Sequence, residues 1–340
     1  MKLSDITPYL IYDFKTEHEL TKSISEISHN FTQAREDIDV YVKDERLVAA
    51  YTCFYLLTNI PKLTKVFEKI DMNLIDYADY EFVDIGAGPG TFSLALLKEN
   101  PEQSIIAIEK SELMIKQGHA IVGGIHPKAD FKYYSSLLDI PTKTKKRFGI
   151  FGHSANEMSL SWVQRFVKEC DLDLILFIEP GTKEFFKKSL ELRTRLTRNF
   201  YLNYPCLCST ICPLPEGDWC HQYLNISHEK DVERLTQLVQ KDRRSLPIII
   251  NLYSKSTLQP HTEVGAGRIV RVYKPTKFSQ EWQVCVKSEK LENQVIELQI
   301  MNRGYTKSEL KELRFISAGD KINFTKLKDL SDNNVRGKLI

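Results

Sequence analysis

The residues best suited to chemistry in this chain of 340 residues are a group of cysteines in its second half. Four of them fall within fifteen residues: Cys206, Cys208, Cys212 and Cys220. Prolines and a glycine interrupt the same segment, which predicts a loop that folds around a bound group. Structural zinc sites favour paired C-x2–4-C spacing, and only Cys208 and Cys212 have it. Iron–sulfur clusters accept looser spacing and a remote fourth cysteine, so the thiols indicate a metal centre of either kind.

A second chemical signal is the glycine-rich run Asp84-Ile-Gly86-Ala-Gly88-Pro-Gly90, which follows an apolar segment and precedes a helical one. Glycine lets the backbone turn sharply and come close to a ligand. Dinucleotide loops have the spacing G-x-G-x-x-G, whereas this run has G-x-G-x-G and a proline. The departure favours a ligand without a pyrophosphate, with Asp84 facing a cationic or hydroxylated group. The alternative is a purely structural turn.

Acidic and amide side chains follow two later apolar segments. Glu109 closes the next expected strand, 25 residues after Asp84, where a carboxylate can accept both hydroxyls of a ribose. Asn156 and Glu157 follow the expected fourth strand, and they either orient a cofactor or substrate or cap the next helix. The catalytic residues stay unknown, because no side chain in this pattern is identified as a general base.

Alternating strands and helices must position these groups. Continuous apolar runs at 82–85, 104–109, 148–151 and 174–178 are separated by helical stretches, which predicts an α/β fold with a doubly wound, Rossmann-like parallel sheet. Helical periodicity covers residues 16–70, and β alternation returns after 265 as a small sheet or barrel. The expected domains are a helical cap (1–74), a nucleoside-binding core (75–200), a cysteine-rich insert with the last core elements (201–261) and a basic β extension (262–340).

The net charge of +2, from 47 basic and 45 acidic residues, conceals an asymmetry. Residues 1–180 sum to −7 and residues 181–340 to +9. The basic residues gather on the segment after Glu179, before the fourth strand and in the β extension: Lys183, Lys187, Lys188, Arg193, Arg195, Arg198, Lys143, Lys145, Lys146, Arg147, Arg268, Arg271, Lys274 and Lys277. Such side chains neutralise phosphates, and Tyr273 and Phe278 between them can stack on bases. The pattern favours RNA over a merely solvated surface.

The glycine run and Glu109 together resemble class I S-adenosylmethionine methyltransferases over residues 75–200. A more specific likeness comes from Phe177-Ile-Glu-Pro-Gly-Thr182, the cysteine loop ending in Cys-Pro-Leu and Asp-Trp-Cys-His, and a late cysteine in the β extension. Over residues 75–325 these features resemble the ribosomal-small-subunit protein twenty-two family. The resemblance implies a methyltransferase-like assembly factor of the small ribosomal subunit, with rRNA and ribosomal proteins as partners.

The same resemblance implies two ligand sets. Cys206, Cys212, Cys220 and Cys285 would hold a [4Fe–4S] cluster, with zinc as the alternative, while Cys208 is either spare or a substitute. Asp84, Gly86, Gly88, Gly90, Glu109 and Asn156 would bind S-adenosylmethionine. Two other functions stay open, an active rRNA methyltransferase and a zinc-stabilised RNA-binding protein. A radical enzyme is excluded, because no C-x3-C-x2-C segment is present.

The composition also bears on whether the protein is a membrane protein or a secreted one. The longest apolar stretch, 47–57, is too short to cross a bilayer, and no signal peptide or transit peptide is recognised. An odd cysteine count argues against a secreted disulfide framework. We therefore expect a soluble protein of the bacterial cytoplasm, or alternatively the mitochondrial matrix. It should have no membrane or DNA partner and be monomeric when free.

Overall fold

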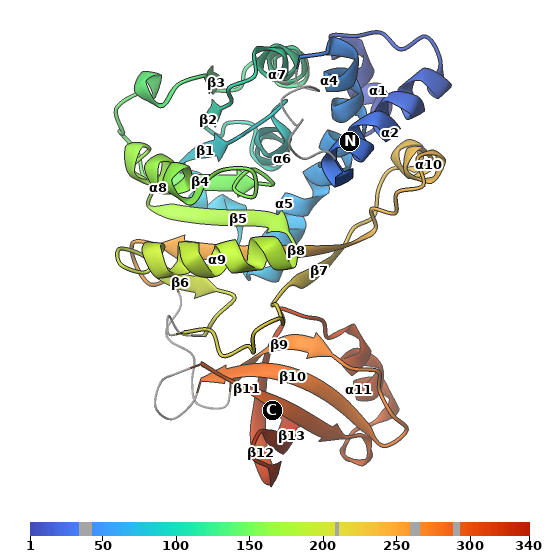
Figure 1. Cartoon of the computed structure of the whole chain (residues 1–340), viewed down its shortest axis with the longest axis vertical. Helices are drawn as coiled ribbons and strands as arrows, with labels where there is room; N and C mark the ends of the chain where they lie inside the picture. Colours follow the sequence, from blue (N-terminus) through green and yellow to red (C-terminus); the bar gives the residue numbers. More distant parts are fainter. Residues whose placement is uncertain (34–42, 208–210, 259–265, 288–292) are drawn as a thin grey trace. The chain divides into compact units, whose positions relative to one another are not determined.

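The computed structural model describes residues 1–33, 43–207, 211–258, 266–287 and 293–340. The chain divides into two compact units, each built from two stretches of sequence. Unit 1 holds Met1–Asp173 and Leu224–Leu246, and unit 2 holds Leu174–Tyr223 and Pro247–Ile340. Figure 1 shows the elements of both units in sequence colours.

Unit 1 is centred on four parallel strands in the order β3-β2-β1-β4. They are β1 (Glu81–Ile85), β2 (Ile105–Ile108), β3 (Phe131–Tyr134) and β4 (Arg147–Gly152). The helices that join or follow them are α6 (Thr91–Glu99), α7 (Glu112–Ile125) and α8 (Leu160–Glu169). The chain adds strands on one side of β1 and then returns to place β4 on the other. Ligands of doubly wound sheets bind where the order reverses in this way.

Most of the described residues between 17 and 69 are helical, as their periodicity predicts. The helices are α1 (Leu3–Ile6), α2 (Glu17–Gln33), α4 (Glu45–Tyr51) and α5 (Leu57–Lys69). A π-helical turn, Thr52–Leu56, joins α4 to α5. Helix α4 packs against α2 and α7, and α5 packs against α6. Helix α10 (Lys230–Leu238) rejoins this unit from later in the sequence. No helix among these or the other described residues is long and apolar enough to span a membrane.

Unit 2 contains an antiparallel group of strands and helix α9 (Lys183–Leu196). Strand β8 (Ser245–Ser254) lies between β5 (Leu174–Pro180) and β6 (Tyr201–Tyr204), antiparallel to both. The short strand β7 (Gln222–Asn225) also pairs with β8. The expected strand at 174–178 is confirmed, but the prediction of parallel strands alone is incomplete, because β6 and β8 add antiparallel pairs.

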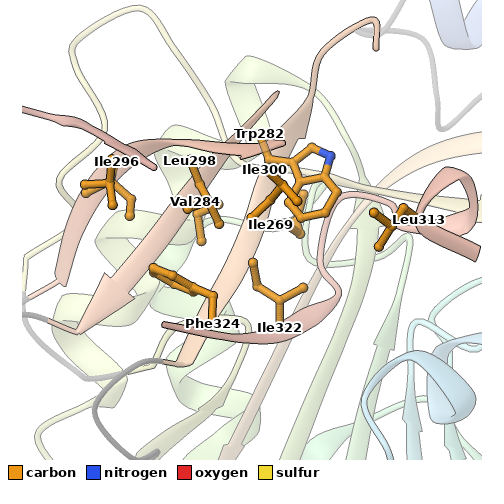
Figure 2. Close-up of a cluster of buried hydrophobic side chains, with 10 residues drawn as sticks. Ile269, Trp282, Val284, Ile296, Leu298, Ile300, Leu313, Ile322 and Phe324 are labelled. Carbon is orange, nitrogen blue, oxygen red and sulfur yellow. The ribbon is translucent and has the colours of Figure 1, made fainter. Parts of the chain in front are cut away.

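The rest of unit 2 is a closed barrel of five strands, β10-β11-β13-β12-β9. The strands are β9 (Ala266–Val272), β10 (Ser279–Lys287), β11 (Asn293–Met301), β12 (Lys321–Ser331) and β13 (Asn334–Leu339), with α11 (Lys307–Glu312) between the third and fourth. Trp282, Val284, Leu298 and Ile300 are buried inside, and Leu313 after α11 joins the same core (Figure 2). The separate β extension is therefore confirmed.

Candidate functional site

A cavity of about 650 Å3 opens at the carboxyl ends of all four parallel strands of unit 1. Gly86 and Gly88 follow β1, Glu109 follows β2, and residues 135–138 follow β3. Gly152 closes β4 and precedes His153 and Ser154 on the same wall. The volume lies within the range of pockets for small molecules and cofactors. Its position is the reversal point that the strand order predicts.

Two glycines of the loop that follows β1 have left-handed backbone conformations. Gly86 has φ +70°, and a Cβ there would lie 2.5 Å from the Cβ of Ser154. The Ser154 hydroxyl donates to the carbonyl of Ile85 at 2.5 Å, so Ser154 is held in place. Gly88 has φ +54°, with open space where its Cβ would be. The loop therefore leaves room for a ligand to approach its backbone closely at Gly88.

Glu109 is tied to this loop by backbone hydrogen bonds. Its Oε2 accepts the N–H of Gly88 at 3.0 Å, and its Oε1 accepts those of Lys110 and Ser111 at 2.8 and 2.9 Å. Ser111 is in turn the N-cap of α7. A carboxylate fixed by three donors is a preorganised acceptor at the cavity wall.

Asp84 is buried behind the cavity rather than on its wall. Its Oδ2 accepts the N–H and the hydroxyl of Ser93 at 3.0 and 2.8 Å, which ties β1 to the first turn of α6. Burial raises the pKa of Asp84 to about 6, against the opposing effect of both Ser93 hydrogen bonds. A carboxyl in this setting supports the glycine loop from beneath.

The structure brings only some of the predicted cofactor residues together. Gly86, Gly88 and Glu109 line the cavity, and Asp84, Gly90 and Asn156 are not among its lining residues. Gly90 has φ +84° and begins α6. The N-cap of α8 is Ser159, whose side chain accepts the N–H of Trp162, so neither Asn156 nor Glu157 serves that role. Glu157 itself lies on the cavity wall.

Sequence reasoning missed two contributions from the N-terminal helices. Tyr51, the last residue of α4, lines the cavity, and burial raises its pKa. Lys62 of α5 is 2% exposed, and its ammonium donates to Nε2 of His153 at 2.6 Å. His153 has φ +59° at the end of β4. Burial and the neighbouring cations Lys62 and Arg243 lower its pKa well below the usual value, so the imidazole is neutral.

A second, smaller cavity of about 50 Å3 lies within unit 2, and four cysteines line it. They are Cys206, Cys212, Cys220 and Cys285. The first three come from the loop between β6 and β7, and Cys285 comes from β10 of the barrel. All four carry free thiols. Residues separated by up to 79 positions thus line one cavity.

Cationic and amide groups surround these thiols. Nη1 of Arg193, which is 7% exposed, lies 3.4 Å from Sγ of Cys206. Arg268, which lines the same cavity, stacks over the ring of Tyr204 at 4.5 Å. Burial, followed by the nearby Cys206 and Cys212, raises the pKa of the Cys220 thiol. Several thiols gathered around one cavity, with arginines beside them, have the chemistry of a site for a cationic iron or zinc core.

The thiols are not yet arranged as metal ligands. Among the described residues, no three His, Cys, Asp or Glu side chains lie close enough to hold an ion. Cys208 lies outside the described residues, so its role stays a prediction. The donor set of four thiols fits a metal–thiolate centre.

Several residues predicted to form a basic face are structural instead. Lys143 pairs with Asp171 and Asp173 at 3.0 and 2.7 Å, and the buried Arg147 pairs with Glu81 at 2.8 Å. In unit 2, Arg271 pairs with Asp218 at 2.6 Å. Arg193 and Arg268 are buried at the cysteine cavity. These five arginines and lysines hold the fold together, and the exposed cations of the barrel remain for other partners.

The sequence matches the family described as mitochondrial small ribosomal subunit Rsm22 over residues 45–312. The chain belongs to this family. The match includes the parallel strands, the cavity at their ends and all four cysteines of the second cavity. A search of curated proteins found no match to the chain.

Solved methyltransferase structures are distant from this chain. Precorrin-6y C5,15-methyltransferase from Geobacter metallireducens GS-15 is 16% identical, with 58% of this chain and 86% of that chain covered and a TM-score of 0.36. The plantazolicin methyltransferase BpumL in complex with SAH is 13% identical, with 71% and 97% covered and the same TM-score. The identities and TM-scores are low, and the doubly wound sheet of this Rsm22-family chain is established by its own strand order.

Proposed function

We propose that this Rsm22-family chain is an rRNA-binding assembly factor of the small ribosomal subunit. In this proposal it binds S-adenosylmethionine in the cavity of unit 1 and a [4Fe–4S] cluster in the cavity of unit 2. The observation that carries the proposal is the gathering of Cys206, Cys212, Cys220 and Cys285 around one cavity in a chain of this family. A small-subunit partner follows from the family description.

The S-adenosylmethionine site is supported by the cavity at the reversal point of the sheet. Gly88 gives the ligand close access to the backbone, and Glu109 offers carboxylate oxygens to its hydroxyl groups. Gly90 and the buried Asp84 would support the loop rather than touch the ligand. Asn156 stays a proposed contact. When bound, S-adenosylmethionine supplies a methyl group on a positively charged sulfur.

The cluster is supported by the donor set of unit 2. A four-thiolate cluster carries net negative charge, which Arg193 and Arg268 would offset. Cys285 would attach the barrel to the loop that holds the other three ligands. Zinc bound by the same thiols is the alternative, and metal analysis separates the two.

Active rRNA methylation is the second candidate function. Its support is the wall after β4, where His153 and Glu157 face the same cavity as the glycine loop. His153 is a poor base, because Lys62 donates to its Nε2 and its pKa is lowered. Glu157 is exposed and would have to accept the proton. Because the described residues of the cavity include no good general base, the first candidate function, in which the fold acts as a non-catalytic scaffold, is favoured.

Three measurements on one preparation test the proposal. Protein purified without oxygen should be brown and contain about four iron and four sulfide per chain. It should bind S-adenosylmethionine in calorimetry and co-sediment with small, but not large, ribosomal subunits. Colourless protein with stoichiometric zinc would show that zinc is bound in place of the cluster. Equal co-sedimentation with both ribosomal subunits would overturn the assembly function. Transfer of labelled methyl to small-subunit rRNA, abolished by Glu157→Gln, would establish the second candidate instead.

A further inference from the structure

The barrel of unit 2 has a specific connectivity. Numbered in chain order, the five strands are β9 to β13. β9 pairs with β10, β10 with β11, β11 with β13, β13 with β12, and β12 with β9. The third and fifth strands, β11 and β13, are parallel, while the other pairs are antiparallel. The helix α11 lies between the third and fourth strands. This is the arrangement of the OB-fold, whose second and third strands commonly bind oligonucleotides.

We propose that the outer face of β10 and β11, together with the β9–β10 loop, binds single-stranded RNA. The side chains that face outward form a row across three strands. Gln299 of β11 donates to Glu281 of β10 at 3.2 Å. Arg336 of β13 donates through Nε and Nη2 to the side-chain oxygen Oε1 of Gln299, at 3.0 and 2.8 Å. Carboxylate, amide and guanidinium groups in one row match the mixed donors and acceptors of base edges.

The loop between β9 and β10 presents an aromatic ring beside this row. Phe278 is 68% exposed, and the ammonium of Lys277 lies 5.8 Å from its ring centre. The loop is fixed, because Thr276 and Ser279 exchange hydrogen bonds and the carbonyl of Phe278 accepts the N–H of Asn302 at 2.8 Å. An exposed ring on a fixed loop loses little entropy when a base stacks on it, and stacking is the main sequence-tolerant contact in single-strand binding.

The charge of the barrel suits a polyanion. Residues 266–340 contain fifteen Lys and Arg against nine Asp and Glu. Lys328 lies opposite Arg336 in the β12–β13 hairpin and is exposed, as is Lys338. With Lys277 they place cations along the row, where the phosphates of a strand stacked on Phe278 would pass.

The other end of the same face is already occupied within unit 2. Arg271 of β9 pairs with Asp218 of the cysteine loop, and Cys285 of β10 faces the cysteine cavity. The open part of the face is therefore limited to the end that carries Glu281, Gln299 and Phe278. Its short length suits a few unpaired nucleotides better than a duplex. The choice of RNA as the nucleic acid rests on the proposed function.

The experiment measures binding of the full chain to a fluorescent single-stranded RNA of about twelve nucleotides and to the matching duplex, by anisotropy over a range of salt. We expect tighter binding to the single strand. Phe278→Ala should weaken it by about five- to a hundredfold, the loss of one stacked base. Lys277→Ala with Lys328→Ala should reduce the slope of log affinity against log salt by about 1.4. The matched controls, Phe315→Ala and Lys307→Ala with Lys311→Ala, should leave both values unchanged.

Equal binding of single strand and duplex, or no effect of Phe278→Ala and the lysine pair, overturns the proposal. Failure here is distinct from failure of the proposed function. A chain that co-sediments with small subunits but does not bind the oligonucleotide leaves that function standing and this site wrong. Binding of the oligonucleotide through Phe278 without co-sedimentation would support this site and overturn the proposed function. Co-sedimentation that needs Phe278 while no RNA binds would make this face a protein-docking surface and contradict the proposal.

Discussion

The two cavities of this chain are built from different parts of the polypeptide. In unit 1 the ends of four parallel strands, with the turns and helices that follow them, enclose about 650 Å3. In unit 2 side chains form the site, and four thiols surround only about 50 Å3. The first cavity is already shaped for its ligand, and the second would be completed by one.

This difference predicts different couplings between binding and folding. A ligand of a preformed cavity adds stability by mass action alone, which is RT ln(1 + [L]/Kd). A metal centre that draws Cys206, Cys212, Cys220 and Cys285 together contributes its binding energy to the fold itself. Loss of S-adenosylmethionine should leave unit 1 folded, whereas loss of the metal should loosen unit 2.

The strongest test of that contrast is Cys220→Ser. We expect the cluster iron to be lost and the melting temperature of unit 2 to fall by about 10 °C or more, since several kcal/mol of metal binding would disappear. Iron and sulfide analysis and calorimetry measure the two effects. Cys170→Ala is the matched control, because Cys170 is fully buried in unit 1 and should not affect iron content. Unchanged iron in Cys220→Ser would remove this residue from the ligand set.

A second test separates the two glycines of the preformed site. Gly86→Ala combines a positive φ with a Cβ 2.5 Å from Ser154, and should lower the free energy of unfolding by about 2–4 kcal/mol. Gly88→Ala meets no atom within 4 Å, and should cost about 1 kcal/mol in stability while its methyl group obstructs the ligand. Denaturation and calorimetric titration with S-adenosylmethionine measure both. Equal destabilisation by the two would contradict the geometry.

A third test uses the buried carboxyl behind the loop. The folded-state pKa of Asp84, about 6, lies above its ordinary value of 3.8. The folded chain thus binds the proton more tightly, and this group makes stability fall as pH rises from about 4 to about 6. Asp84→Asn should remove that dependence and, at pH 7, raise the free energy of unfolding by about 1–3 kcal/mol. Denaturation of both proteins at several pH values measures it, and parallel curves would refute the assignment.

The smallest expected effect concerns His153. Lys62→Met removes a cation 2.6 Å from Nε2, so the pKa of His153 should rise, while burial keeps it below the ordinary value. NMR titration of the imidazole measures the shift, with His126 as an internal reference in the same unit. A pKa that does not move would mean that burial and Arg243 alone hold the imidazole neutral.

The sequence predicts those strands whose side chains are all buried. β1, β2, β4 and β5 are continuous apolar runs, and their positions are confirmed. β3 escapes notice because it is only half-buried and contains Lys132 and two tyrosines. β8 contains Pro247, which interrupts the pattern. β12 is exposed along most of its length and carries lysines where an apolar alternation would be expected.

The residues of the candidate sites also differ in how readily the sequence identifies them. Glycine spacing and the acid after β2 identify the loop and Glu109, because both follow their strands directly in sequence. Tyr51 lines the cavity and Lys62 contacts His153 of its wall, both from helices that precede the sheet, and no local pattern connects either residue to the site. The clustering of Cys206, Cys212 and Cys220 is visible in the sequence. Only the family resemblance relates Cys285 to them.

The closure of the barrel has a consequence for the order of folding. β9 obtains its second neighbour only when Lys321 of β12 pairs with Arg268, a separation of more than fifty residues. Until β12 pairs with it, β9 has only β10 as a partner strand in the barrel. Contacts so distant in sequence form slowly, and open edges attract other strands. The free edge of β9 is therefore open to pairing with strands of other chains until β12 has been synthesised and has paired with it.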